Sequence, residues 1–157
     1  MTAVKATIDI DAPPEDVWEA LMDPTRLREW VTIHRKLGKS PKPPLELGDE
    51  LDQTLCLRGV NFKVHWTVRE ADRPRRAVWE GKGPARSKSR TVYEVHANGD
   101  GTRFDYRNEF TAPGGPLGSA ASRVLMGGGP QREANASLQR LKKLVEGRYS
   151  PLFYLFR

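Results

Sequence analysis

Cysteine and histidine are scarce in this sequence. Its 157 residues include one cysteine, Cys56, and three histidines that lie far apart in the chain. A single cysteine excludes an internal disulfide and agrees with a reducing compartment. Zinc sites use closely spaced pairs of Cys and His ligands, and no such pair occurs here. The sequence therefore predicts no metal site.

Long apolar runs are also missing. No stretch reaches the roughly 18 apolar residues that a membrane-spanning helix needs. The first residues alternate apolar with polar side chains and lack the uninterrupted apolar segment of a secretory signal. We expect a soluble, cytoplasmic protein.

The glycine clusters match no cofactor-binding motif. Neither Gly114-Gly115 nor Gly127-Gly128-Gly129 is followed by the Lys-Ser/Thr of a phosphate loop, and no serine stands in a G-x-S-x-G turn. Gly81-Lys82-Gly83 lacks the third glycine of a dinucleotide fingerprint. The sequence predicts no cofactor.

The charge balance is basic, with 26 Lys and Arg against 20 Asp and Glu, a formal net charge of +6 and a pI near 9.7. Such a balance attracts anionic ligands, acidic lipid headgroups or nucleic acid. The basic residues stand in scattered groups without a nucleic-acid-binding motif. We predict a solvated basic surface, no specific nucleic acid, and a membrane contact as an open alternative.

The first 112 residues contain strand patterns and two short helices. A period-two alternation predicts a strand over 4–10, and prolines open two helices that end near Trp30. Asn98-Gly99-Asp100-Gly101 is typical of a tight hairpin. After a candidate strand over 31–37 and a Pro- and Lys-rich loop, the predicted strands are 50–57, 60–70, 77–81, 87–97 and 102–112.

The segment from Pro116 to Glu146 carries the longest helical pattern. Leu138, Leu141 and Val145 fall on one apolar stripe, which predicts an amphipathic helix. The run from Gly127 to Pro130 interrupts the pattern, and such a run kinks or unwinds a helix. It is either a structural kink or a hinge that widens an entrance.

This order of elements resembles the START-like or helix-grip superfamily (SRPBCC), which includes polyketide cyclase/dehydrase-like proteins. The likeness rests on Ile8 to Trp18, on Asp23-Pro24 through Trp30, on Gly99 to Arg103 before a strand, and on Gly115 to Gly118 entering a helix. The resemblance implies an α+β fold in which a curved antiparallel sheet of six or seven strands wraps around a long C-terminal helix. It makes residues 1–148 one ligand-binding domain, followed by an apolar C-terminal tail over 149–157.

In that family a cavity lies between sheet and helix, so the inward side chains are the ligand candidates. Alternation assigns inward positions on each strand, although a one-residue bulge would exchange the faces beyond it. The polar members of this set either bond to one another and to buried water or orient a ligand. The predicted ligand-binding residues are Gln53, Phe62, Trp66, Trp79, Thr91, Tyr93, Tyr106, Asn108, Leu117, Ala121 and Leu125.

Candidates for acid–base catalysis are few. His65, His96 and Cys56 fall on the outward phase, and the inward strand positions contain no Asp or Glu. Tyr93, Tyr106 and His34 are the remaining catalytic candidates, since phenols and imidazoles act as general acids or bases when their pKa is tuned. The sequence leaves open whether the protein is an enzyme.

Three functions follow as hypotheses. The first is binding of a small hydrophobic ligand, such as a lipid, a polyketide or an aromatic metabolite, in the cavity. The second is a polyketide cyclase, aromatase or dehydrase. The third is an interaction module at a membrane or ribonucleoprotein, suggested by the apolar tail, and the sequence leaves both monomer and homodimer open.

Overall fold

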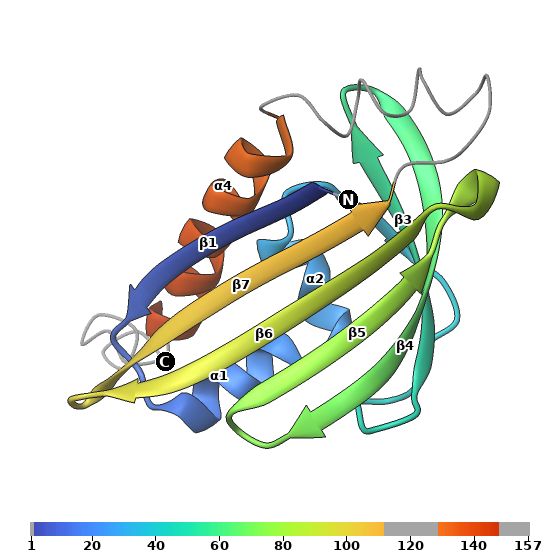
Figure 1. The fold of residues 1–157 in the computed structure, drawn as a ribbon. Helices are drawn as coiled ribbons and strands as arrows, with labels where there is room; N and C mark the ends of the chain where they lie inside the picture. The colour runs from blue at the N-terminus through green and yellow to red at the C-terminus, as the bar shows by residue number, and fades with distance from the viewer. Residues whose placement is uncertain (1, 112–128, 148–157) are drawn as a thin grey trace.

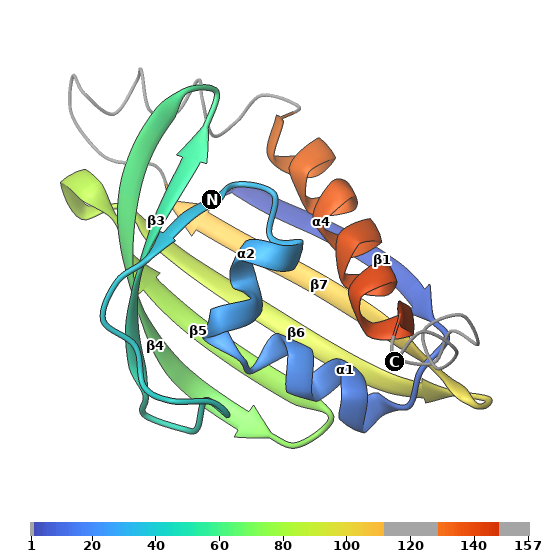
Figure 2. The ribbon, with the colours of Figure 1, turned by 180° about the vertical axis from the view of Figure 1, so that it is seen from behind.

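The protein forms one curved antiparallel sheet with its helices on the concave side (Figures 1 and 2). The computed structural model describes residues 2–111 and 129–147. The sheet has seven strands in the order β1-β7-β6-β5-β4-β3-β2. The strands are β1 (Thr2–Ile10), β2 (His34–Leu37), β3 (Glu50–Leu57), β4 (Val60–Asp72), β5 (Arg76–Lys82), β6 (Lys88–Asn98) and β7 (Gly101–Thr111). The helices are α1 (Pro14–Leu21), η1 (Pro24–Arg26), α2 (Leu27–Trp30), η2 (Pro84–Arg86) and α4 (Gly129–Glu146).

The predicted α+β helix-grip architecture is confirmed. Apart from β1, which pairs with β7, the strands pair with their neighbours in sequence, as the short turns between them require. The β6–β7 hairpin closes between Asn98 and Gly101, where Gly99 has a φ of +60° that favours glycine. These turns fix the register of the sheet.

The two short helices begin where the prolines predict. Pro14 is the first residue of α1, and Pro24 is the first residue of η1. The Asp23 carboxylate caps η1 by accepting hydrogen bonds from the Thr25 N–H at 3.0 Å and from its hydroxyl at 2.6 Å. These helices bury Trp18, Leu21 and Trp30 against the concave side of the sheet.

Helix α4 crosses the concave side beside β1 and packs on α2 (Figure 2). Leu138, Leu141 and Val145 are buried, as the apolar stripe predicts. Pro130 stands in the first turn of the described helix, where a missing N–H donor costs little. The predicted helix over 116–126, Gly127 and Gly128 of the predicted break, and the tail over 149–157 lie outside the described residues, whereas Gly129 and Pro130 of the break are the first residues of α4.

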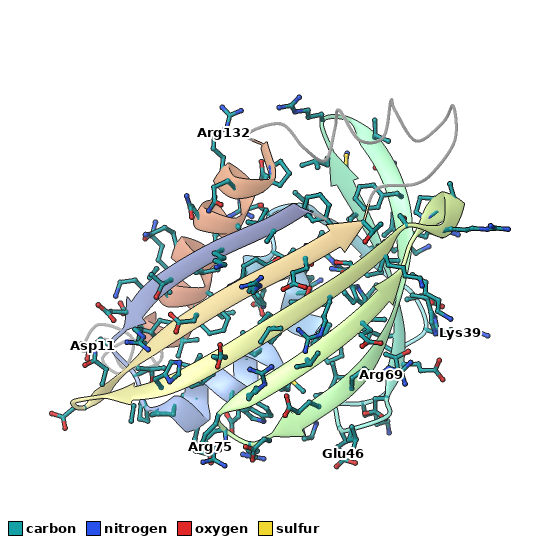
Figure 3. All side chains as sticks on the ribbon, in the orientation of Figure 1. Asp11, Lys39, Glu46, Arg69, Arg75 and Arg132 are labelled. Carbon is teal, nitrogen blue, oxygen red and sulfur yellow. The ribbon has the colours of Figure 1, made fainter. Side chains whose placement is uncertain are left out.

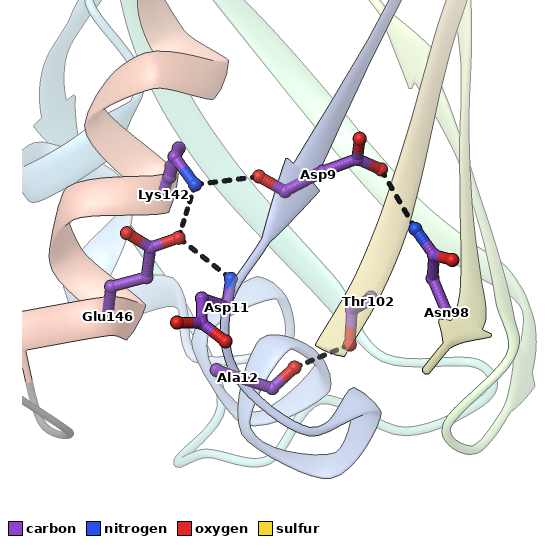
Figure 4. A network of polar contacts seen from close by, with 7 residues as sticks. All are labelled: Asp9, Asp11, Ala12, Asn98, Thr102, Lys142 and Glu146. Carbon is purple, nitrogen blue, oxygen red and sulfur yellow. Dashed lines mark hydrogen bonds and ion pairs between the residues drawn. The ribbon is translucent and has the colours of Figure 1, made fainter. Parts of the chain in front are cut away.

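One end of the molecule is tied together by polar contacts, and we call it the closed end (Figure 4). The Glu146 carboxylate accepts a hydrogen bond from the Asp11 N–H at 2.7 Å and pairs with the Lys142 ammonium. Lys142 also donates to the Asp9 carbonyl at 2.9 Å. These contacts join the last turn of α4 to the end of β1. Thr102 of β7 donates to the Ala12 carbonyl at 2.7 Å beside them.

A bulge interrupts β4 between Val68 and Glu70. Before it, Val64, Trp66 and Val68 face inward as predicted. Beyond it the faces exchange, so that Ala71 packs on the core and Glu70 binds Arg76 on the outside. On β4, the alternation in the sequence therefore assigns the inward and outward faces correctly only as far as Val68. No helix in the described ranges is long and apolar enough to span a membrane.

Candidate functional site

A cavity of about 300 Å³ lies between the concave face of the sheet, α2 and the first half of α4. This volume is at the lower end of the range for small-molecule sites, about 300 to 1,000 Å³. The lining includes Val60, Asn61, Pro84 and Lys88, which are exposed to solvent. The cavity therefore opens at the β3–β4 turn and η2, opposite the closed end.

The structure brings the predicted ligand-binding residues together around this cavity. Leu117, Ala121 and Leu125 lie outside the described residues. All the others line the cavity: Gln53, Phe62, Trp66, Trp79, Thr91, Tyr93, Tyr106 and Asn108.

Aromatic rings form a continuous wall of the cavity. Trp79 lies edge-on to Trp66 at 6.0 Å and to Tyr93 at 5.5 Å, and Tyr93 lies 6.2 Å from Tyr106 between ring centroids. Gly81 makes room for this wall, because a Cβ there would stand 2.8 Å from the Trp66 ring. Such a wall offers large, rigid surfaces to an apolar or aromatic molecule.

Gln53 is held by hydrogen bonds on both ends of its amide. Its Oε1 accepts from the Trp66 indole N–H at 2.9 Å, and its Nε2 donates to His34 Nδ1 at 2.9 Å. His34 therefore carries its proton on Nε2 and is neutral. His34 does not itself line the cavity, and burial lowers its pKa. The imidazole acts on the cavity only by positioning Gln53.

The pKa of His34 makes stability depend on pH. Because the folded pKa lies below the ordinary 6.5, the folded state binds fewer protons than the unfolded state. We expect the free energy of unfolding to fall as the pH decreases below 6.5, and the His34 NMR titration to have its midpoint below that value. His65 acts in the opposite direction, because hydrogen bonds from its ring to Glu50 and Asp52 raise its pKa. Its contribution is complete below pH 6.5 and is lost as the pH rises through its folded pKa.

Urea titrations at several pH values check this expectation. The His34→Gln variant keeps an amide oxygen for Gln53 but has no titrating ring, so its free energy of unfolding should fall less on acidification. An equally steep fall in that variant would show that His34 does not cause the pH dependence.

Asn108 on β7 binds two polar side chains of β6, Ser89 and Thr91. Its Oδ1 accepts hydrogen bonds from the Ser89 hydroxyl at 2.6 Å and from the Thr91 hydroxyl at 3.3 Å. These groups satisfy one another, which is the structural one of the two predicted alternatives. Among the described residues, the Asn108 amide nitrogen has no hydrogen-bond acceptor.

Tyr93 and Tyr106 differ from the other polar residues of the lining. Neither hydroxyl has a hydrogen-bond partner among the described residues. Burial raises the pKa of Tyr106 to about 12 and raises that of Tyr93 further, with a smaller contribution from Tyr106. Both phenols are therefore protonated at neutral pH. Among the described residues these hydroxyls have no acceptor, and the indole N–H groups of Trp30 and Trp79 in the same lining are buried without a partner as well.

Helix α4 adds a polar patch that sequence reasoning missed. Glu133 and Ser137 line the cavity one helical turn apart, and both bind Thr32 in the loop after α2. The Thr32 N–H donates to the Ser137 hydroxyl at 3.0 Å, and the Thr32 hydroxyl donates to the Glu133 carboxylate. The predicted polar candidates all lie on strands, and the predicted helix candidates, Leu117, Ala121 and Leu125, are apolar and lie before this part of the helix. The i, i+4 spacing on the stripe of Leu138 and Leu141 is the signal that could have found this pair.

A family model described as "Polyketide cyclase / dehydrase and lipid transport" matches residues 1–146. The chain belongs to this family. Over 131 aligned residues the chain is 30% identical to the uncharacterized protein Rv1546 of Mycobacterium tuberculosis. The aligned region covers 81% of this chain and 90% of that protein. It is 28% identical over 128 residues to the toxin Rv0910 of the same species, with 80% of this chain and 88% of the relative covered.

Solved structures share the fold of this member of the polyketide cyclase/dehydrase family. The Zhui aromatase/cyclase from Streptomyces sp. R1128 superposes with a TM-score of 0.80 at 14% identity, over 96% of this chain and 97% of that one. TTHA0849 from Thermus thermophilus gives a TM-score of 0.77 at 18% identity, over 95% and 100%. At these identities the likeness concerns the fold alone. The predicted family resemblance is confirmed.

The outward histidines and the cysteine of this family member lie away from the cavity. His65 binds Asp52 at 2.6 Å and Glu50 at 2.8 Å on the convex face, and His96 binds Asp105 at 3.1 Å. Cys56 is a free, partly exposed thiol. Within residues 2–111 and 129–147, no group of three or more His, Cys, Asp or Glu could hold a metal ion.

Proposed function

We propose that this protein binds a small, mainly apolar molecule in the cavity, and that the molecule presents a hydrogen-bond acceptor to Tyr93 and Tyr106. The observation that carries the proposal is the pair of protonated phenols, which have no acceptor among the described residues and stand in a lining that is mainly aromatic and aliphatic. An acceptor such as a carbonyl oxygen would satisfy these donors. A lipid, polyketide or aromatic metabolite carrying a carbonyl has this chemistry.

The polar groups elsewhere in the lining support the same ligand class. Ser89 and Thr91 are occupied by Asn108, and Gln53 is occupied by His34 and Trp66. Their pairing leaves apolar surface over most of the wall, because few polar groups remain free to hold a hydrated ligand. The donors of Tyr93, Tyr106 and Asn108, which have no acceptor among the described residues, then orient the molecule.

Titration with Nile red tests the proposal. Nile red is a planar, apolar dye with a carbonyl acceptor, and it is neutral, so the basic surface does not attract it by charge. We expect saturable binding, and an affinity about fivefold lower in the Tyr106→Phe variant, because one neutral hydrogen bond contributes about 1 kcal/mol. Pyrene, which has no acceptor, serves as the control probe, and its affinity should not change.

The outcomes separate the two parts of the proposal. If neither dye binds saturably and native mass spectrometry finds no molecule bound to the purified protein, ligand binding is wrong. If Tyr106→Phe weakens Nile red and pyrene equally, the acceptor does not meet Tyr106.

A cyclase- or dehydrase-type reaction is the second candidate function. Protonated phenols that point at a carbonyl oxygen also stabilise the negative charge that develops on that oxygen when an adjacent carbon loses a proton. Glu133, in the same lining, is a carboxylate that could accept the proton. With an identified substrate, turnover that is unchanged in both Tyr106→Phe and Glu133→Gln would rule out this mechanism.

A further inference from the structure

Among the described residues, the cavity lining contains a single carboxylate, that of Glu133 on α4. The side chain is partly buried, and its Oε2 accepts a hydrogen bond from the Thr32 hydroxyl. This contact holds the carboxylate in the wall of the cavity. Its other oxygen, Oε1, has no donor among the described residues and can accept a hydrogen bond from a ligand.

No basic side chain of the described residues is paired with this carboxylate. Arg58 lies one helical turn before it, where a Cβ on Gly129 would stand 3.3 Å from Arg58 Nε, but it forms no ion pair with Glu133. Arg132 is exposed and points away from the sheet (Figure 3). Lys88, the cation of the lining, is exposed at the cavity mouth. The protein therefore leaves the charge of Glu133 to be compensated from the cavity.

The fold does not need a charge at this position. Ser137, one turn further along α4, already joins the helix to the loop after α2, because its hydroxyl accepts from the Thr32 N–H at 3.0 Å and lies 3.2 Å from the Thr32 hydroxyl. A carboxylate that faces a mainly apolar cavity loses hydration, and an opposite charge offsets that loss best. The position of Glu133 thus favours a cationic group on the ligand.

The aromatic wall of the same cavity favours a cation independently. Trp79 lies 6.0 Å from Trp66 and 5.5 Å from Tyr93 between ring centroids, so several rings border one space. The faces of aromatic rings attract ammonium groups, and the attraction is stronger where water is excluded. A carboxylate and a group of aromatic rings around one cavity are together suited to an organic ammonium ion.

We propose that Glu133 selects an apolar ligand that carries a protonated amine. The ammonium group binds the Glu133 carboxylate, and the acceptor of the same molecule meets the phenols of Tyr93 and Tyr106. An ammonium fits better than a hydroxyl, because a hydroxyl leaves the charge uncompensated, and a ligand carboxylate is repelled. This inference rests on the proposed ligand-binding function and narrows its ligand class to apolar amines.

Three probes with one ring system test the selection: 1-pyrenemethylamine, 1-pyrenemethanol and 1-pyrenecarboxylate. The unchanged protein should bind the amine about tenfold more tightly than the alcohol, because a charge-assisted hydrogen bond is about twice as strong as a neutral one and the ion pair adds Coulomb attraction. The carboxylate should bind most weakly. The net charge of +6 would produce the opposite order, so attraction by net charge cannot explain this result.

The Glu133→Gln variant removes the charge but keeps an amide oxygen for the Thr32 hydroxyl. We expect its affinity for the amine to fall about tenfold, to that of the alcohol, while the affinity for the alcohol changes by less than about twofold. Glu80→Gln is the matched control. Glu80 is exposed on the convex face, binds Arg69 at 3.1 Å and does not line the cavity, so this variant should change all three affinities by less than about twofold.

Three results would overturn the selection by Glu133. The first is equal affinity for the amine and the alcohol in the unchanged protein, a measurement that does not depend on a variant that folds. The second is an equal loss for all three probes in Glu133→Gln, which would mean that the side chain shapes the cavity without distinguishing charge. The third is the same loss of the amine in Glu80→Gln.

Competition with Nile red keeps this inference apart from the proposed function. If Nile red displaces the alcohol but the amine binds no more tightly, ligand binding in the cavity stands and the selection by Glu133 is wrong. If no probe binds saturably, both are wrong. Displacement of a tightly bound amine by Nile red would support both.

Discussion

The Thr91→Trp variant is expected to bind Nile red about 5- to 150-fold more weakly than the unchanged protein. Thr91 is buried on β6, and its side chain faces the cavity between Trp79 and Asn108. An indole there occupies volume that the ligand needs, and overpacking costs about 1 to 3 kcal/mol when both are present. Without ligand the indole enters existing space. Among the described residues, the side-chain hydrogen bond lost is the long one from Thr91 to Asn108, while Ser89 keeps its own to Asn108 at 2.6 Å.

The same substitution on the opposite face of the sheet is the control. Thr67 stands on β4 next to Trp66 but points outward, and it does not line the cavity. Thr67→Trp should leave Nile red affinity unchanged, and thermal denaturation should show both variants folded. A folded Thr91→Trp protein that binds as tightly as Thr67→Trp would place the dye outside the cavity.

The Leu141→Ala variant is expected to lose about 3 kcal/mol of stability, with a Tm about 10 °C lower. Leu141 is 0% exposed and packs in the core cluster beneath α4, near the closed end. Truncation removes transfer free energy and leaves a cavity that the surrounding strands fill only in part. Because domains are stable by only about 5 to 15 kcal/mol, this is a large fraction of the total. Urea denaturation gives the free energy directly.

Leu144→Ala on the same helix is the matched control. Leu144 is only partly buried against the core, so its truncation should cost about 1 kcal/mol. If both variants lost the same free energy of unfolding, burial of a side chain on α4 would not determine how much that side chain stabilises the fold.

The sheet could be predicted because apolar and polar residues alternate along a strand that is buried on one face only. Val64, Trp66 and Val68 alternate with exposed residues, and the turn at Gly99 sets the neighbouring register. The same alternation could not foresee the bulge after Val68. A bulge depends on how β4 fits β5, which is a property of the pair and not of either strand alone.

The strand residues that line the cavity could be predicted, whereas their contacts and the helix residues of the lining could not. The strand residues of the lining follow from alternation, but the pairing of His34 with Gln53 depends on how β2 and β3 align. Glu133 was not predicted because its position in the lining also depends on a contact between two elements. A charged residue next to apolar ones on a helix normally faces solvent, and only the approach of Thr32 after α2 gives this carboxylate a place in the wall.

The wall of rings described around Tyr93 also gives the protein an optical reporter of its own. Trp30, Trp66 and Trp79 line the cavity, whereas Trp18, the remaining tryptophan of the chain, is buried in the core outside it. Indole emission responds to the polarity of its surroundings and to quenching by nearby groups. Occupancy of the cavity can therefore be followed through the intrinsic fluorescence of the unlabelled protein, with Trp18 contributing a constant background.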